Sequence, residues 1–234
     1  MTNSELKHKL ISNSPVIAPS MLKCDFGNLH REIELLETAD AQVLHWDVMD
    51  GHFVPNLSYG ALLIERVRSL TSMVFDAHLM IRHPEKYIDD YIKAGCDSIT
   101  VHIEAVPDPT EILNHLNQSG AIPGLAISPK TPLSAVEPYL DQCGLVLIMS
   151  VEPGFGGQSF IESSLDKIKQ LKSMIPADTI LSVDGGIAMD TIAETAGAGA
   201  NYFVVGSAIF DQADYSTAVS ELAAKARNQA ASST

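Results

Sequence analysis

The sequence predicts a single-domain α/β fold, a closed (β/α)8 TIM barrel. Short apolar runs rich in β-branched residues recur eight times along the 234 residues, and consecutive runs begin 22 to 35 residues apart. This spacing is too long for hairpins and fits a strand, a loop, a helix and a return loop. The chain is slightly shorter than the ~250 residues typical of such barrels. The runs begin near Val16, Val43, Met73, Asp97, Ala121, Gly144, Thr179 and Asn201.

The segments between these runs carry helix signals. DFGNLHREIELLETA, HPEKYIDDYIKAG and SSLDKIKQLKSM are amphipathic with a 3.6-residue period, as expected of helices that cover a barrel. An open doubly wound sheet is the alternative fold. It would place a G-x-G-x-x-G turn after an early strand, whereas the first run here continues into APSMLKCDF. The closed barrel is therefore favoured.

Composition predicts the domain boundaries and the cellular location. We expect an exposed leader over residues 1–15, the barrel over residues 16–228 and a loose tail over residues 229–234. The longest strongly apolar run, GLVLIM, is far below the ~20 residues of a membrane span. Because the leader also lacks the apolar core of a secretory signal, the sequence predicts a cytoplasmic protein that does not bind membranes.

Charge and cysteine content narrow the function. The formal net charge of -14 argues against nucleic-acid binding and against an anionic membrane surface, which both require clustered basic residues. The three cysteines show neither a disulfide framework nor zinc-ligand spacing, which fits a reducing compartment. An anionic substrate remains compatible with this charge, since backbone amides form local anion sites.

Ionisable side chains close three of the predicted strands. At a strand period of two, His45 and Asp47 share one face of VLHWDVM, and His78 and Met80 share one face of DAHLM. Asp184 is the last strand residue before a glycine pair. Barrel enzymes place their reactive groups at these strand ends. Individually each residue can be a satisfied core or turn residue, but four buried together require pairing or a metal. Imidazole and carboxylate ligands suit one divalent ion such as Zn, Fe(II), Mn or Co.

Glycine-rich turns follow the last three predicted strands. VEPGFGGQSF, VDGGI and VVGSAIF supply Gly154, Gly156 and Gly157, then Gly185 and Gly186, then Gly206 with Ser207. Barrels bind phosphate with loops after their last strands, where glycine lets backbone N–H groups approach the oxygens. The alternative is that these glycines only permit tight turns. Three adjacent loops favour a phosphorylated small-molecule substrate.

Methionines and several weaker candidates also fall near strand ends. Met49, Met80 and Met149 can line the barrel mouth with apolar, polarizable surface, or can simply fill the core. Asp50 belongs to an Asp-Gly pair that is typical of turns. His102 closes the fourth run, and Lys130 lies in a proline-bounded loop.

These motifs carry a family resemblance. IAPSML, HWDVMDGHFVPN, DAHLM, SVEPGFGGQSFI, VDGGI and VVGSAIFD occur in order between Val16 and Asp211, and together they resemble the ribulose-phosphate 3-epimerase family. The departures are MLKCDF after Ser20, where small or aliphatic residues are more usual, and Trp46 between His45 and Asp47. We expect Trp46 to face outward, towards the helices.

The resemblance implies a metal-dependent epimerase that interconverts D-ribulose 5-phosphate and D-xylulose 5-phosphate in the pentose phosphate pathway. Its metal ligands would be His45, Asp47, His78 and Asp184, with Asp47 and Asp184 also as the acid-base pair. It further implies a homo-oligomer, a dimer or hexamer. The implied substrate contacts are Ser20, His78, Gly154, Phe155, Gly156, Gly157, Asp184, Gly185, Gly186, Gly206 and Ser207. The alternatives are an allulose-6-phosphate 3-epimerase and a non-catalytic sugar-phosphate-binding barrel.

Overall fold

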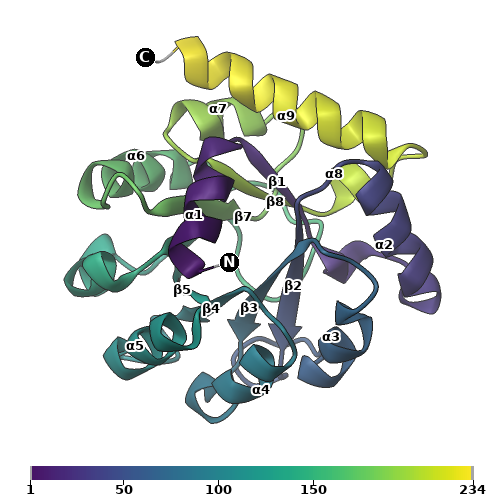
Figure 1. Cartoon of the computed structure of the whole chain (residues 1–234). Helices are drawn as coiled ribbons and strands as arrows, with labels where there is room; N and C mark the ends of the chain where they lie inside the picture. The colour runs from purple at the N-terminus through teal and green to yellow at the C-terminus, as the bar shows by residue number, and fades with distance from the viewer. Residues whose placement is uncertain (1, 233–234) are drawn as a thin grey trace.

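A computed structural model describes residues 2–232, which form one barrel of parallel strands surrounded by helices (Figure 1). Within these residues the sheet has eight strands in the order β1-β8-β7-β6-β5-β4-β3-β2. The strands are β1 (Val16–Pro19), β2 (Val43–Met49), β3 (Val74–Met80), β4 (Ser98–His102), β5 (Ile122–Ile127), β6 (Leu145–Met149), β7 (Ile180–Asp184) and β8 (Tyr202–Val205).

The barrel closes between β1 and β2, where Ser20 and His45 form a parallel bridge. Every strand begins at, or one residue after, the start predicted from the apolar runs. The prediction of a (β/α)8 barrel is therefore confirmed. Its parallel strands are buried on both faces, which is why they read as continuous apolar runs.

Helices connect most of the strands. The three amphipathic segments correspond to α2, α4 with the 3-10 turn before it, and α6. The α-helices are α1 (Asn3–Ser12), α2 (Leu29–Thr38), α3 (Ala61–Arg68), α4 (Ile88–Lys93), α5 (Thr110–Ser119), α6 (Ser164–Met174), α7 (Ile192–Gly197), α8 (Ser207–Phe210) and α9 (Tyr215–Ser232), and the 3-10 helices are η1 (Met21–Lys23), η2 (Phe26–Asn28), η3 (Pro84–Lys86), η4 (Leu133–Ala135) and η5 (Glu137–Gln142).

The connection between β5 and β6 departs from the regular repeat. In this described segment the α-helix is replaced by η4 and η5. Pro129, Pro132 and Pro138 interrupt it, and a proline inside a helix removes a hydrogen bond and clashes with the preceding turn. The repeat therefore keeps its length here but not its helix.

Side chains alternate between two cores. Those that point outward pack against the helices, and Trp46 is among them, fully buried beside Phe75 as expected. The inward side chains of β5, β6 and β8 form an apolar interior. The inward side chains of β2, β3 and β4 are instead mostly polar and buried: His45, Asp47, Asp76, His78, Ser98, Thr100 and His102. Buried ionisable and polar side chains are thus concentrated on one side of the barrel interior.

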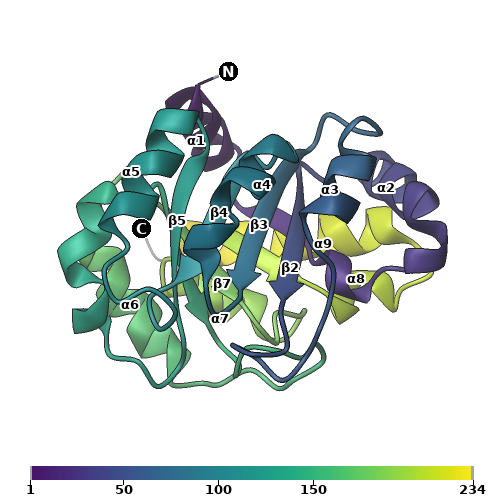
Figure 2. The same cartoon turned by 90° about the horizontal axis from the view of Figure 1, so that it is seen from below.

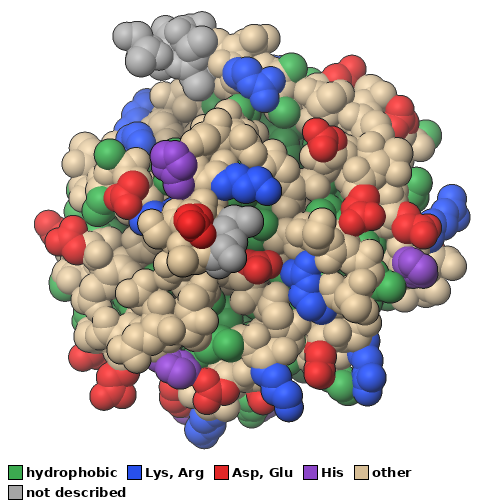
Figure 3. Space-filling view, in the orientation of Figure 1, with side chains coloured by type: hydrophobic (Ala, Val, Ile, Leu, Met, Phe, Trp, Pro, Cys, Tyr) green, Lys and Arg blue, Asp and Glu red, His purple; other side chains and the backbone are tan. Residues whose placement is uncertain are grey.

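The N-terminal segment differs from the exposed leader that the sequence predicted. Helix α1 lies across the end of the barrel opposite the strand C-termini (Figures 1 and 2). Leu6 and Leu10, one helical turn apart, are buried against the apolar interior. Thr2 and Glu5 form a capping box that starts the helix. Acidic and basic side chains are interspersed on this face (Figure 3).

The C-terminal segment also differs from the expected boundary. Helix α9 continues through residue 232, so residues 229–232 of the expected loose tail are helical, and residues 233–234 lie outside the described residues. α9 packs along α7 at the edge of the barrel. Within the described part of the chain, no helix combines the length and the apolar character needed to cross a membrane.

We expect α1 to contribute to folding stability. Leu10→Ala leaves a cavity under the barrel and should lower the free energy of unfolding by about 2–4 kcal/mol. Lys9→Ala, on the exposed side of the same helix, should change it by less than about 0.5 kcal/mol. Urea unfolding of both variants measures the difference. Equal stabilities would contradict a packed role for α1.

Candidate metal centre and active-site cavity

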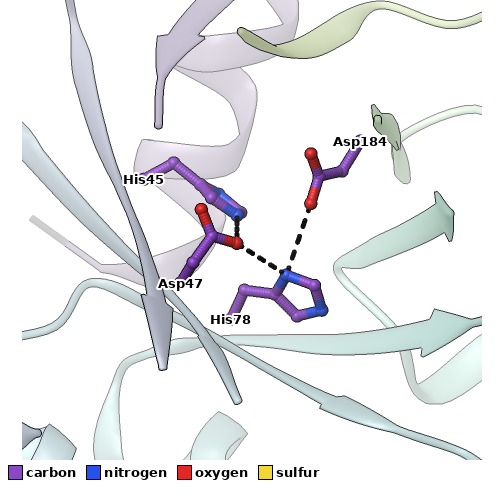
Figure 4. Close-up of side chains that lie close together, drawn as sticks. All are labelled: His45, Asp47, His78 and Asp184. Atoms are coloured by element: carbon purple, nitrogen blue, oxygen red, sulfur yellow. Dashed lines mark hydrogen bonds and ion pairs between the residues drawn. The ribbon is translucent and has the colours of Figure 1, made fainter. Parts of the chain in front are cut away.

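Four ionisable side chains meet at the C-terminal end of the barrel. His45 and Asp47 come from β2, His78 from β3 and Asp184 from the end of β7 (Figure 4). Each offers one ligand atom, and these four atoms lie within 4.8 Å of one another. The first three side chains are buried, whereas Asp184 is 16% exposed and opens to the cavity above. The structure thus brings together the four residues predicted from the strand ends.

The contacts centre on one carboxylate oxygen. Asp47 Oδ1 lies 3.4 Å from His45 Nε2 and 3.3 Å from His78 Nδ1. His78 Nδ1 also lies 3.6 Å from Asp184 Oδ2. The Ser20 hydroxyl donates a 2.5 Å hydrogen bond to the other oxygen, Asp47 Oδ2. Asp47 therefore uses both oxygens inside the site.

The pKa shifts express mutual charge compensation. Burial lowers the pKa of His45, but the carboxylates of Asp47 and Asp76 outweigh burial and hold it well above its usual value. Burial raises the pKa of Asp47, but His45 and His78 hold it well below its usual range. The pKa of His78 is also raised, since hydrogen bonds to Asp184 and Asp47 outweigh burial. The raised pKa values of the imidazoles and the lowered pKa of Asp47 have one cause, the pairing of opposite charges inside the site.

The outer hydrogen bonds orient His45. Its Nδ1–H donates to Asp76 Oδ2 at 2.8 Å, and the Tyr202 hydroxyl, from β8 across the barrel, donates to the same oxygen at 2.8 Å. His45 Nε2 has no hydrogen-bond partner of good geometry among the described residues. Loss of the Nε2 proton therefore leaves a lone pair that faces the site.

A second chain orients His78. His102 Nδ1–H donates to Glu104 Oε2 at 3.0 Å, and His102 Nε2 lies 2.8 Å from His78 Nε2. Burial lowers the pKa of His102 to about 4. Burial alone would raise the pKa of Glu104, but hydrogen bonds, chiefly the one from His102, lower it to about 2. A neutral His102 with its proton on Nδ1 must accept at Nε2, so His78 carries its proton on Nε2. His78 Nδ1 then faces the site.

These two hydrogen-bond chains fit a metal centre. Both imidazoles can present a lone pair beside two carboxylates, a donor set that suits a borderline divalent ion. His45 Nε2 points to the same conclusion, because its 3.4 Å contact with Asp47 Oδ1 is not a hydrogen bond of good geometry and a buried nitrogen without a hydrogen bond is costly. The site is therefore a candidate metal centre. Asp76, Glu104 and Tyr202 were not predicted as site residues, although the D-x-H and H-x-E spacings place the two acids on the same strand faces as the histidines.

A cavity of about 650 Å³ opens directly above this centre. Asp47 and Asp184 form part of its floor, while His45 and His78 lie beneath it. Of the residues expected to contact substrate, all but His78 line the cavity. These residues are Ser20, Gly154, Phe155, Gly156, Gly157, Asp184, Gly185, Gly186, Gly206 and Ser207.

The glycine loops form part of the cavity wall. At Gly185 and Gly186 the φ angles are 118° and 63°, and an added Cβ would lie 2.5 Å from Val151 and from the Phe160 nitrogen. Only glycine fits at these two positions. Among the described residues, the N–H groups of Gly185, Gly186 and Gly206 have no protein acceptor. They are available to an anion.

Met49, Met80 and Met149 line the cavity close to the carboxylates and are themselves buried. They add apolar surface to the cavity wall; whether they also support catalysis stays a prediction. Phe155 is 53% exposed at the rim of the cavity.

The loop after β2 fixes the position of Asp47. The Tyr59 hydroxyl accepts from Asp47 N at 2.9 Å, and Ser58 Oγ donates to Asp47 O at 2.6 Å and accepts from Met49 N at 3.0 Å. The loop therefore satisfies the edge of β2 beyond the point where β1 ends. Sequence reasoning had not singled out Ser58 or Tyr59.

The weaker candidates have other roles. Asp50 accepts from the N–H groups of His52, Phe53 and Arg82, so it organises turns. Lys130 is exposed and pairs with Glu152 outside the cavity.

Taken together, the fold and site define a barrel protein with a candidate divalent-metal centre beneath an anion-compatible cavity. The model of the ribulose-phosphate 3 epimerase family matches residues 16–210. The chain belongs to this family.

Curated relatives agree with this assignment. The chain is 43% identical to ribulose-phosphate 3-epimerase of Bacillus subtilis over 88% of its own length and 97% of the relative. It is 44% identical to the Synechocystis protein of the same name, with 89% and 93% covered. The chloroplastic ribulose-5-phosphate-3-epimerase of Arabidopsis thaliana is 42% identical, with 91% and 77% covered.

Solved structures that are more distant share the fold. KGPDC from Streptococcus mutans superposes with a TM-score of 0.67 at 16% identity, covering 92% of this chain and 99% of that one. A 3-hexulose-6-phosphate synthase gives a TM-score of 0.67 at 18% identity, with 90% and 99% covered. At these identities the similarity shows the barrel alone.

We predict that Asp76 controls metal affinity through His45. Asp76→Asn removes the charged acceptor of the Nδ1–H group and should weaken Zn²⁺ or Co²⁺ binding by about 10- to 100-fold. Tyr202→Phe should cause a smaller loss. Equilibrium dialysis measures both. Ser182→Ala, which removes a buried hydroxyl with no hydrogen-bond partner among the described residues, should bind metal like the unmodified protein. Unchanged affinity in Asp76→Asn would contradict the proposed orientation.

Proposed function

We propose that this protein interconverts D-ribulose 5-phosphate and D-xylulose 5-phosphate by inverting carbon 3. The observation that carries the proposal is the placement of Asp47 and Asp184 on β2 and β7, both in the floor of one cavity beside the histidines. Family membership supports the same activity. The reaction belongs to the pentose phosphate pathway.

Inversion at carbon 3 requires a proton carrier on each face of the carbon. Removing the proton next to the carbonyl gives a planar enediolate, and returning a proton to the other face gives the epimer. Asp47 and Asp184 come from strands well separated around the barrel. In our proposal Asp47 removes the proton from one epimer and Asp184 delivers a proton to the opposite face. The roles exchange in the reverse direction.

Charge develops on the substrate oxygens during proton removal. A divalent ion held by His45, Asp47, His78 and Asp184 would supply Lewis-acid stabilisation of that charge, on the scale of several kcal/mol. Zn, Fe(II), Mn and Co all suit this donor set. The Asp76 and Glu104 chains keep both imidazoles oriented, and Ser20 holds Asp47 Oδ2.

Substrate positioning falls to the cavity walls. The free N–H groups of Gly185, Gly186 and Gly206 would bind the phosphate, with Gly154, Gly156 and Gly157 closing over it from the loop after β6. Phosphate held in this way fixes carbon 3 between the two carboxylates. Met49, Met80 and Met149 exclude water, which strengthens electrostatic interactions in the site.

The family resemblance also implies a homo-oligomer, and one surface is suited to it. Leu57 and Leu62 are 73% and 68% exposed and line a hollow with Tyr87 beside the β2 end of the barrel. Burial against a second copy would remove this apolar surface from water. A cytoplasmic location stays a prediction; the cysteines are free and buried, which fits it.

The experiment that tests the function is proton exchange at carbon 3 of D-ribulose 5-phosphate in deuterated water, followed by NMR. Deuterium incorporation together with growth of xylulose 5-phosphate is the expected result. No exchange by folded, metal-loaded protein would rule the activity out. Faster exchange with allulose 6-phosphate would favour the six-carbon epimerase, and binding without exchange would favour a non-catalytic barrel.

Each carboxylate should be required for turnover. Asp47→Asn and Asp184→Asn, assayed at saturating metal, should each lower kcat by about 10²- to 10⁴-fold because one proton carrier is lost. Asp166→Asn, on the exposed surface of α6, is the matched control and should keep full activity. If Asp47→Asn turned over at the normal rate, the two-carboxylate mechanism would be wrong.

Metal removal should abolish activity reversibly. Chelation followed by dialysis should reduce carbon-3 exchange to background, and adding back one divalent ion should restore it, because the charge on the substrate oxygens then has a counter-charge. Metal content by mass spectrometry and the exchange rate are measured on the same sample. Full activity in demonstrably metal-free protein would contradict metal dependence.

A further inference from the structure

The cavity above the candidate metal centre is strongly acidic. Five carboxylate residues line it: Asp47, Glu162, Asp184, Asp190 and Glu194. Asp47 and Asp184 are compensated by the histidines of the metal centre, whereas Glu162, Asp190 and Glu194 form no ion pair among the described residues. A phosphate dianion entering this cavity therefore meets like charge, in a protein whose net charge is already -14. Backbone N–H groups supply partial positive charge but no full counter-charge. The phosphate site therefore requires a positively charged side chain.

Lys23 is the only lysine or arginine among the described residues that line the cavity, and no histidine lines it. It ends the 3-10 helix η1, directly after β1. Met21 and Cys24 on either side are buried in the outer core, which fixes the backbone here. The position of Lys23 is thus set by the fold although its side chain is exposed.

The stem of Lys23 runs between two glycine loops. A Cβ atom placed on Gly206 would lie 3.1 Å from Lys23 Cγ, and one placed on Gly156 would lie 3.4 Å from Lys23 Cδ. The aliphatic part therefore passes from the loop after β8 towards the loop after β6. These are the loops to which the proposed function assigns the phosphate.

The ammonium group is not committed elsewhere. Among the described residues it makes no ion pair or side-chain hydrogen bond. The lysines nearest to the same end of the barrel differ in this respect. Lys130 pairs with Glu152 outside the cavity, and Lys167 donates to the carbonyls of Ser128, Pro129 and Thr131. Of the lysines in the described part of the chain, Lys23 is the one that combines an unpaired ammonium group with contact to the glycine loops.

We propose that Lys23 is a substrate-binding residue whose ammonium group neutralises the phosphate held by the Gly156 and Gly206 loops. This inference rests on the proposed function for the identity of the phosphorylated substrate. The charge acts on the phosphate, remote from carbon 3, so it contributes equally to ground-state and transition-state binding. Its effect should appear in KM and not in kcat.

The test compares three variants. Lys23→Met keeps the stem and removes the charge, Lys23→Arg keeps the charge, and Lys130→Met makes the same change of net charge outside the cavity. For Lys23→Met we expect KM to rise about three- to tenfold with kcat within twofold, and the salt dependence of kcat/KM to become shallower. Lys23→Arg and Lys130→Met should stay within twofold of the unmodified protein.

Inorganic phosphate provides a readout independent of turnover. Its affinity, measured by calorimetry on the metal-loaded protein, should fall about three- to tenfold in Lys23→Met only. Unchanged phosphate affinity in Lys23→Met, or an equal loss in Lys130→Met, would overturn the proposal. If the unmodified protein binds phosphate through Lys23 but catalyses no epimerisation, the proposed function fails while the anion site stands.

Discussion

The constraint on which the rest of the structure depends is the burial of His45, Asp47 and His78 at one end of the barrel, next to the partly exposed Asp184. An isolated charge in this environment would cost several kcal/mol, and pairing offsets that cost only when the geometry and the remaining hydrogen bonds are satisfied. Asp47 lies between His45 and His78. Asp76 bonds to His45 directly, whereas Glu104 is linked to His78 through His102. The charges alternate outward from the centre. This alternation lets the same side chains exist as a protonated cluster or as a metal site.

The alternation also explains the asymmetry of the barrel interior. Asp76 is buried because it accepts from His45 and from Tyr202, which reaches it from β8 on the other side of β1. The interior on the side of β5 and β6 can then remain apolar, and Leu6 and Leu10 of α1 close it at the far end. Because one sheet bends into a closed barrel, the buried polar groups of β2 and β3 find hydrogen-bond partners on one side of the interior, and apolar side chains pack together on the other side.

Most of the fold and the innermost residues of the site could be predicted from the sequence, because the patterns that encode them are local. Strands and glycine turns are encoded over a few residues, and strand periodicity alone places His45 and Asp47 on one face. The residues that orient them depend on long-range geometry. The contact between Tyr202 and Asp76 joins residues 126 apart and exists only because the barrel closes. Helix α1 is a different case. The capping box of Thr2 and Glu5 is a signal that the sequence contains, but only two side chains of the helix, Leu6 and Leu10, are buried, so its apolar pattern is weak.

The junction of β1 and β2, where the barrel closes, also determines how the site is built. β1 is short, and the pairing of this segment with β2 among the described residues is limited to the bridge between Ser20 and His45. Beyond that point, the edge of β2 that carries Asp47 and Met49 lacks a strand partner, and Ser58 and Tyr59 supply the missing hydrogen bonds. Because β1 stops there, the chain can turn into η1. In this turn Ser20 bonds to Asp47, and Lys23 lies beside the glycine loops. The short length of β1 therefore lets one segment reach both the carboxylates and the proposed phosphate site of the cavity.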